Sequence, residues 1–275
     1  MSFRPINPQN ALVEASVVMR FSRPFFEPEL AAIRGLHGRF AKDLPQLATT
    51  PVNTIFIGAA PVGGLPGAPV TMAAYKKDGT FETRLQIQGD LLIINFLLYT
   101  HWSELWPKAQ LWASSVLDAA RTVGLPDGTL PIQITSVLHQ MIDAFVWEGE
   151  SANVSVQALF SSMHSRLPGA SWDAKGLGWF AAHSTNEAMT DADIPQSVLV
   201  DWLACDLSDE PGLGWRLRLE NTLEVRFAQS LPPLALFSGD LATKLMNDLH
   251  ARNNFLVKSL LRADMLRRIG MEAPL

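Results

Sequence analysis

Cysteine is almost absent from this chain of 275 residues, because Cys205 is the only one. A single thiol excludes an intramolecular disulfide framework and any zinc site with several cysteine ligands, and it favours a reducing cytoplasm. Basic residues are also scarce, with 22 Lys and Arg against 27 Asp and Glu and a formal net charge of −5. A protein that binds phosphate backbones usually has a high pI and a basic patch, so this balance argues against that class.

Long apolar runs are missing as well. The longest, Leu91–Tyr99, is interrupted by Asn95 and has about half of the length that a membrane-spanning helix needs. The first five residues, Met1–Pro5, lack the apolar core of a signal peptide. We therefore expect a cytoplasmic protein that does not associate with membranes.

The sequence has none of the common catalytic, metal or nucleotide motifs. The spacings HExxH, HxH, CxxC, GxSxG, GxGxxG and GxxxxGK[ST] do not occur, and Cys205 lies in an apolar segment typical of a buried thiol. We expect no metal ion and no cofactor. The histidines are scattered along the chain, at His37, His101, His139, His164, His183 and His250.

With 48% hydrophobic and 18% charged residues, the composition is that of a globular protein. Its hydrophobic periodicity predicts two halves of the same order: strand, helix, three strands, helix. The ranges are 15–21, 24–44, 54–57, 70–75, 81–98 and 102–120 in the first half, and 131–147, 154–167, 178–183, 198–207, 215–227 and 238–269 in the second.

We therefore predict an α+β fold with an internal pseudo-duplication, antiparallel sheets and a long C-terminal helix. The join falls at 124–128, which divides the chain into an N-terminal half, 1–126, and a C-terminal half, 127–275. One alternative is a single continuous domain in which the elements alternate without duplication. If the halves are duplicated, their sheets either pack through their helices or join edge to edge into one curved sheet.

Tryptophan is the most unusual feature, with eight in the chain. Trp102, Trp106 and Trp112 share one stripe of a predicted helix, and Trp202 and Trp215 lie in predicted strands. Such residues commonly pack in a core. They are also enriched at interfaces, so an aromatic groove for a peptide or a ligand is the functional alternative.

Two further sets of residues are candidates for function. His139 and Asp143 share one face of the predicted strand 131–147, as a structural pair or, in an enzyme, a catalytic one. With Trp202 and Trp215 they would line a cavity between sheet and helix. Basic residues in the last helix suit its C-terminal dipole, and they are the candidate contacts to nucleic acid: Arg252, Lys258, Arg262, Arg267 and Arg268.

Short segments spread over nearly the whole chain resemble a family of bacterial proteins of about this length. They are Asn10–Phe21, Leu91–Asn95, Tyr99–Trp102, Leu245–His250 and Phe255. The family has a more basic central strand than the Val137–Asp143 segment of this chain. It is sporadically distributed and has no established activity or catalytic residues, and the resemblance implies an accessory role in defence, toxin neutralisation or mobile elements.

Three functions follow from these observations. The leading hypothesis is a non-enzymatic subunit of a bacterial accessory system that binds another protein or a second copy of itself. The first alternative is a small-ligand binder or an enzyme with a cavity between sheet and helix. The second alternative is nucleic-acid binding through the basic C-terminal helix.

Overall fold

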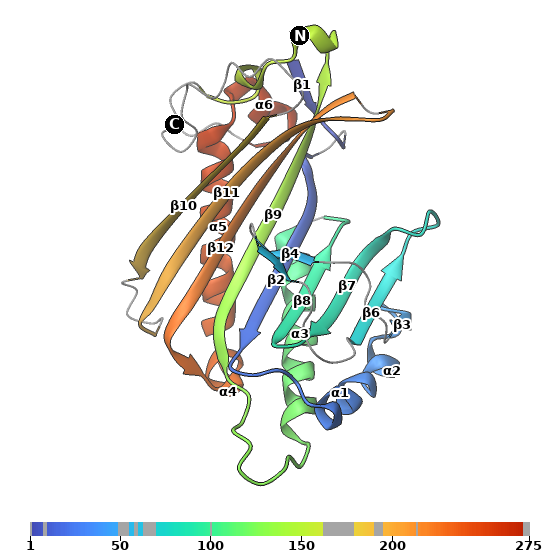
Figure 1. Cartoon of the computed structure of the whole chain (residues 1–275), viewed down its shortest axis with the longest axis vertical. Coiled ribbons are helices and arrows are strands. Elements are labelled where there is room, and N and C mark those ends of the chain that lie inside the picture. Colours follow the sequence, from blue (N-terminus) through green and yellow to red (C-terminus); the bar gives the residue numbers. More distant parts are fainter. Residues whose placement is uncertain are drawn as a thin grey trace.

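Ten strands form one continuous antiparallel sheet, so the fold class is α+β. The computed structural model describes residues 2–7, 10–48, 55–57, 60–62, 70–99, 101–161, 179–189, 195–212 and 214–271. The strands of the sheet are β1 (Ser2–Pro5), β2 (Leu12–Phe21), β3 (Gln46–Ala48), β6 (Val70–Tyr75), β7 (Phe81–Gln88), β8 (Leu91–Phe96), β9 (Ile134–Glu148), β10 (Trp179–Met189), β11 (Ser197–Glu210) and β12 (Gly214–Leu231). Their order is β10-β11-β12-β9-β2-β8-β7-β6-β3, and β1 pairs with the end of β9 (Figure 1).

The two long helices lie on the same face of this sheet, behind it in Figure 1. The helices are α1 (Glu27–Arg34), α2 (His37–Phe40), α3 (Trp102–Arg121), α4 (Pro233–Phe237), α5 (Leu241–Leu260) and α6 (Ala263–Arg268), with 3-10 turns η1 (Ser151–Asn153) and η2 (Val156–Ala158). A separate two-stranded sheet joins β4 (Ile55–Ile57) and β5 (Ala60–Val62). Within the described residues, no helix is long and apolar enough to cross a membrane.

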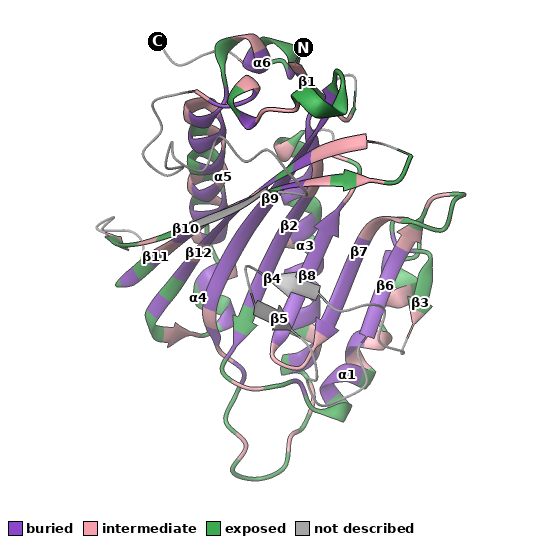
Figure 2. Ribbon diagram, turned by 45° about the horizontal axis from the view of Figure 1, so that its top comes forward, coloured by how far each residue is buried: buried purple, intermediate pink, exposed green. Residues whose placement is uncertain are grey.

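Alternation along the strands directs one apolar face towards the helices. In β12, Leu217, Leu219, Leu223 and Val225 are buried, and the residues between them face the other way. Figure 2 shows burial along most of the central strands β9, β2 and β8. The long helices thus cover one face of the sheet, and the site described below lies on that face.

The strand predicted at 70–75 is confirmed as β6, and it pairs with β7, which begins at Phe81 as expected; Gly79 has a φ of 84° in the turn between them. The single long strand predicted for 81–98 is wrong. The chain reverses between β7 and β8 through Gly89, whose φ of 60° favours glycine. Apolar residues on both sides of this turn concealed it from the periodicity.

Two predicted helices in the second half also differ from the structure. The helix expected at 238–269 is divided, because Leu261 and Arg262 have extended backbones between α5 and α6. The backbone N–H of Arg262 donates to the Leu159 carbonyl at 3.0 Å, and that of Ser161 to the Leu260 carbonyl at 2.7 Å. The same contacts leave only a 3-10 turn at the start of the helix expected at 154–167. Positions 162–167 lie outside the described residues.

The sheet continues across the boundary between the two predicted halves. Strand β2 of the first half pairs with β9 of the second, and the order outward is β8-β7-β6 on one side and β12-β11-β10 on the other. The sheets therefore join edge to edge, the second of the arrangements expected. The duplication and the division into 1–126 and 127–275 stay predictions, because the helix that would repeat α1 does not form in the described part of 154–167.

The buried Trp112 should contribute more to stability than the partly exposed Trp202. Trp112 is 2% exposed, and its ring stacks on Phe96 at 5.9 Å between centroids. We expect Trp112→Ala to lower the free energy of unfolding by about 3–5 kcal/mol, because a large cavity would remain in the core. Trp202→Ala should cost clearly less. Urea denaturation measures both variants, and equal losses would contradict this assignment of Trp112 to the core.

Candidate functional site

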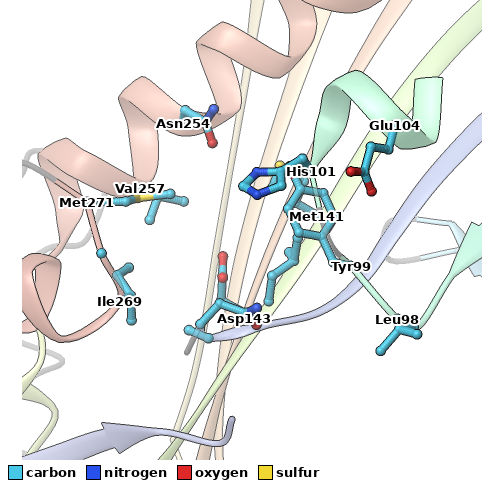
Figure 3. Close-up of a pocket in the computed structure, with 14 residues that line it drawn as sticks. Leu98, Tyr99, His101, Glu104, Met141, Asp143, Asn254, Val257, Ile269 and Met271 are labelled. Atoms are coloured by element: carbon cyan, nitrogen blue, oxygen red, sulfur yellow. The ribbon is translucent and has the colours of Figure 1, made fainter. Parts of the chain in front are cut away.

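A cavity of about 760 Å³ lies on the helix-covered face of the sheet (Figure 3). Its walls come from the start of β2, the segment just before α3, the middle of β9, the second half of α5 and the residues that follow α6. Most of the lining is apolar, and the polar groups are few: Asn10, Tyr99, His101, Glu104, Asp143 and Asn254. This combination is typical of small-molecule sites.

Strand alternation places Asp143 in this cavity. The odd-numbered residues of β9 face the helices: Val137 and Phe145 lie in the core, and Met141 and Asp143 line the cavity between them. Asp143 lies opposite Leu12 of β2, at the point where a register shift interrupts the β2–β9 pairing. Bulges of this kind are common next to functional sites.

The carboxylate of Asp143 is buried without a partner. The side chain is 5% exposed, and no hydrogen bond or ion pair reaches it from the described part of the chain. In Figure 3 it points into the space below Asn254 and His101. Burial raises the pKa of Asp143 from 3.8 to about 7. The structure therefore holds a carboxyl group that loses its proton near neutral pH at a cost in stability.

Three aromatic rings form a cluster beside the cavity. Trp102 of α3 meets His139 of β9 edge to face and stacks on His250 of α5, with both pairs of ring centroids 4.7 Å apart. The two histidine rings are 5.6 Å apart. Trp106 stacks on the other side of Trp102 at 5.9 Å. The cluster fixes the start of α3 against α5.

Side-chain amides hold this cluster in place. Asn253 donates from Nδ2 to Nδ1 of His139 and accepts at Oδ1 from Asn221 of β12. The indole Nε1 of Trp102 donates to Oδ1 of Asn247 at 2.8 Å. His139 is 0% exposed, and its Nε2 has no hydrogen-bond partner in the described structure. This side of the cluster is therefore closely packed and closed to bulk solvent.

The second histidine connects the cluster to the cavity. Nδ2 of Asn254 donates to Nε2 of His250 at 3.0 Å, and Asn254 itself lines the cavity. Burial lowers the pKa of His250 to about 4, and burial together with the charge of His250 lowers the pKa of His139 to about 3. Both imidazoles are neutral at physiological pH, so neither supplies a positive charge to Asp143.

His139 and Asp143 do not form the pair considered from the sequence. They share a face of β9, but four residues of a strand span about 13 Å, which is too far for a hydrogen bond. The cavity expected between sheet and helix is present, with a different lining. Of the four residues named for it, only Asp143 contributes.

The tryptophans separate into different environments. Trp102 and Trp106 belong to the cluster beside the cavity, whereas Trp112 lies in the core against Phe96. Trp202 lies opposite Thr222, on the sheet face turned away from the long helices. Trp215 packs at the edge of the second core cluster, around β1 and α6. The five residues therefore do not form one groove.

Carboxylates neutralise three of the five candidate nucleic-acid contacts. Arg252 pairs with Asp248 at 2.8 Å, Arg262 with Asp264 at 3.2 Å and Arg268 with Glu148 at 3.6 Å. Arg252, Lys258 and Arg262 lie on α5 or just after it, and Arg267 and Arg268 lie in α6. The break between α5 and α6 therefore distributes these basic residues over two helices instead of one.

Sequence reasoning did not find the cavity residues Tyr99, His101 and Asn254, or the cluster residue Asn253. Periodicity indicates which face of an element is buried, but not which distant elements meet. The segments Asn10–Phe21 and Tyr99–Trp102 contain the cavity residues Asn10, Tyr99 and His101, but no sequence signal marked Asn253 or Asn254.

No family model matches the chain, and neither the curated proteins nor the solved structures show a significant similarity to it. The family resemblance has no support from these comparisons, and the site is interpreted from its geometry alone. Over the described residues, no group of three or more His, Cys, Asp or Glu side chains is placed to hold a metal ion. The arrangement instead suits an organic molecule that pairs with one buried carboxylate.

Removing the charge of Asp143 should stabilise the protein above neutral pH. The folded state holds its proton up to about pH 7 and the unfolded chain only to about 3.8, so stability is lost as pH rises through this window. We expect Asp143→Asn to raise the free energy of unfolding by on the order of 4 kcal/mol at about pH 8 and to change it little near pH 4. Urea denaturation at both values tests this. The exposed Asp127→Asn is the control, and an equal effect of Asp143→Asn at both values would contradict the prediction.

His250 should contribute a pH dependence of the opposite sign. Its pKa is about 4 in the folded protein and 6.5 when unperturbed, so stability falls as pH falls from about 6.5 to 4. Replacing His250 by Phe keeps a ring against Trp102 and removes this titration. In an Asp143→Asn background, which removes the opposing slope, we expect a flatter stability profile in this window. An unchanged slope, or the same flattening with the partly exposed His37→Phe, would show that His250 does not cause it.

Proposed function

We propose that the protein binds a small organic molecule in the cavity between β9 and the two long helices. The observation that carries this proposal is the unpartnered carboxylate of Asp143, which points into a cavity of about 760 Å³. Leaving such a group buried is costly unless a partner compensates it. A bound ligand can supply that partner, and the cavity has the size of a typical ligand site.

The lining favours binding over nucleophilic catalysis. The described residues around the cavity include no serine, threonine, cysteine or lysine. The thiol of Cys205 is buried in β11, and burial raises its pKa far above neutral. His139 and His250 are held in ring contacts beside the cavity, with low pKa values that suit packing more than proton transfer at neutral pH.

Protein binding is the second candidate, and one observation favours it. Phe255 of α5 is 69% exposed at the edge of a groove of about 730 Å³ between α5 and the strands β10 to β12. An exposed aromatic side chain beside a groove is typical of interfaces. A role in a bacterial accessory system, a cytoplasmic location and nucleic-acid binding also remain proposals, and the ion pairs of Arg252, Arg262 and Arg268 give the last of these little support.

A thermal-shift screen of the unmodified protein and of a variant with a blocked cavity tests the small-molecule function. The library contains amines, carboxylic acids, sugars, nucleosides and neutral aromatic compounds. Asn254→Trp places a large ring at the cavity wall from a partly exposed position of α5. We expect at least one compound to raise the melting temperature of the unmodified protein and to lose this effect in Asn254→Trp.

Ala251→Trp is the matched control, because it places the same ring on an exposed position of the same helix outside the cavity. A true ligand keeps its effect in this variant. If no compound shifts the melting temperature, or if every shift persists in Asn254→Trp, the cavity is not the binding site and the proposed function is wrong.

A further inference from the structure

The charged side chains around the cavity are acidic. Asp143 lies inside it and Glu104 at its rim, and its described lining contains no lysine or arginine. An anionic ligand would therefore meet two carboxylates and no permanent positive charge. A cationic ligand would gain a buried ion pair with Asp143 and would meet no like charge among these residues.

The dipoles at the ends of the two long helices are consistent with a positively charged ligand. The N-cap His101 and the first-turn residue Glu104 of α3 line the cavity, and the positive end of a helix dipole attracts anions. Glu104 lies in the first turn of α3, where its carboxylate already counters that end. Of the α5 residues in the cavity wall, Val257 lies in the last turn, where the dipole favours a cation, and Asn254 lies one turn earlier.

The rest of the lining fits a hydrocarbon group. Met141, Val257 and Ile269 are buried side chains around Asp143, and Tyr99 presents an aromatic ring. An ammonium group is attracted to such a ring when it lies over its face. A bare metal ion would need several oxygen or nitrogen ligands, and the described side chains do not provide a cluster of them.

On the proposed small-molecule function, we infer that the ligand is an organic amine whose ammonium group pairs with the Asp143 carboxylate and whose hydrocarbon part packs on the apolar walls. Asn254 is the polar residue of α5 in the described cavity lining, and its carbonyl oxygen can accept a second hydrogen bond from the ammonium.

The ion pair between the ammonium group and Asp143 couples ligand binding to the loss of a proton from Asp143. The titratable side chains that line the cavity with Asp143 are Tyr99, His101 and Glu104, and His139 and His250 lie in the ring cluster beside the cavity. Its cross-strand neighbours are Leu12 and Leu219. Asp143 must be ionised to bind the ammonium, and its pKa is about 7 in the free protein. The affinity for the amine should therefore increase about tenfold for each pH unit as the pH is raised towards 7, and it should become constant above pH 7.

Calorimetric titration with probes of matched shape tests the inference. The amines are butylamine, hexylamine, octylamine and phenethylamine, and hexanol and hexanoate are the neutral and anionic counterparts of hexylamine. We expect at least one amine to bind, about tenfold or more tightly than hexanol, and hexanoate not to bind. Titrations near pH 6.5 in two buffers of different ionisation enthalpy should show that binding releases protons.

Two variants identify the group responsible. Asp143→Asn should remove most of the preference for the amine over hexanol and abolish the proton release, whereas Asp127→Asn should change neither. If hexanol or hexanoate binds as tightly as hexylamine, or if the preference persists in Asp143→Asn, the inference is wrong.

The library screen distinguishes this inference from the function on which it rests. If none of the four amines binds while a compound of another class binds and is blocked by Asn254→Trp, the amine inference is overturned and the small-molecule function stands. If no compound of any class binds, both are wrong.

Discussion

The pairing of β2 with β9 is the constraint on which the rest of the structure depends. These strands come from the two predicted halves of the chain, and their hydrogen bonds turn two groups of strands into one sheet. The sheet in turn sets where α3 and α5 lie, since each helix packs over the strands of its own half. The cavity forms between the helices over β9, at the end of this pairing. A site between the halves is thus a geometric result of joining their sheets edge to edge.

The buried polar groups near this site differ in their hydrogen-bond partners and in their surroundings. Asn253 bonds to Nδ1 of His139, and the rings of Trp102 and His250 close around this histidine, whose Nε2 has no hydrogen-bond partner among the described residues. Asp143 lies on the same strand face and has no such partner. Buried polar groups are normally paired, and exceptions are concentrated where a protein binds another molecule. The main reason to assign function to Asp143 and structure to His139 is that Asp143 faces a cavity, whereas His139 is enclosed by aromatic rings and side-chain amides.

Much of the fold follows from periodicity, and the exceptions have local causes. Alternation in β12 and the apolar stripe of α3 reflect burial on one face, which sequence records directly. The turn at Gly89 and the break at Leu261 depend on a glycine conformation and on contacts with Leu159 and Phe160, which a hydrophobic pattern does not contain. The candidate site was found in part: Asp143 was identified by residue type, but its separation from His139 and its approach to Tyr99 and Asn254 require the long-range arrangement.

The cavity is lined by residues from nearly the whole length of the chain, from Asn10 to Met271. Contacts between residues so far apart in sequence form slowly, because a long loop must close before they contribute. During synthesis, Asp143 has left the ribosome long before Ile269 and Met271 are made. The nascent chain therefore carries an incomplete cavity, with this carboxyl group still open to water. Ligand binding would consequently report that the chain has reached its final fold, and it would stabilise that fold only after its last elements are in place.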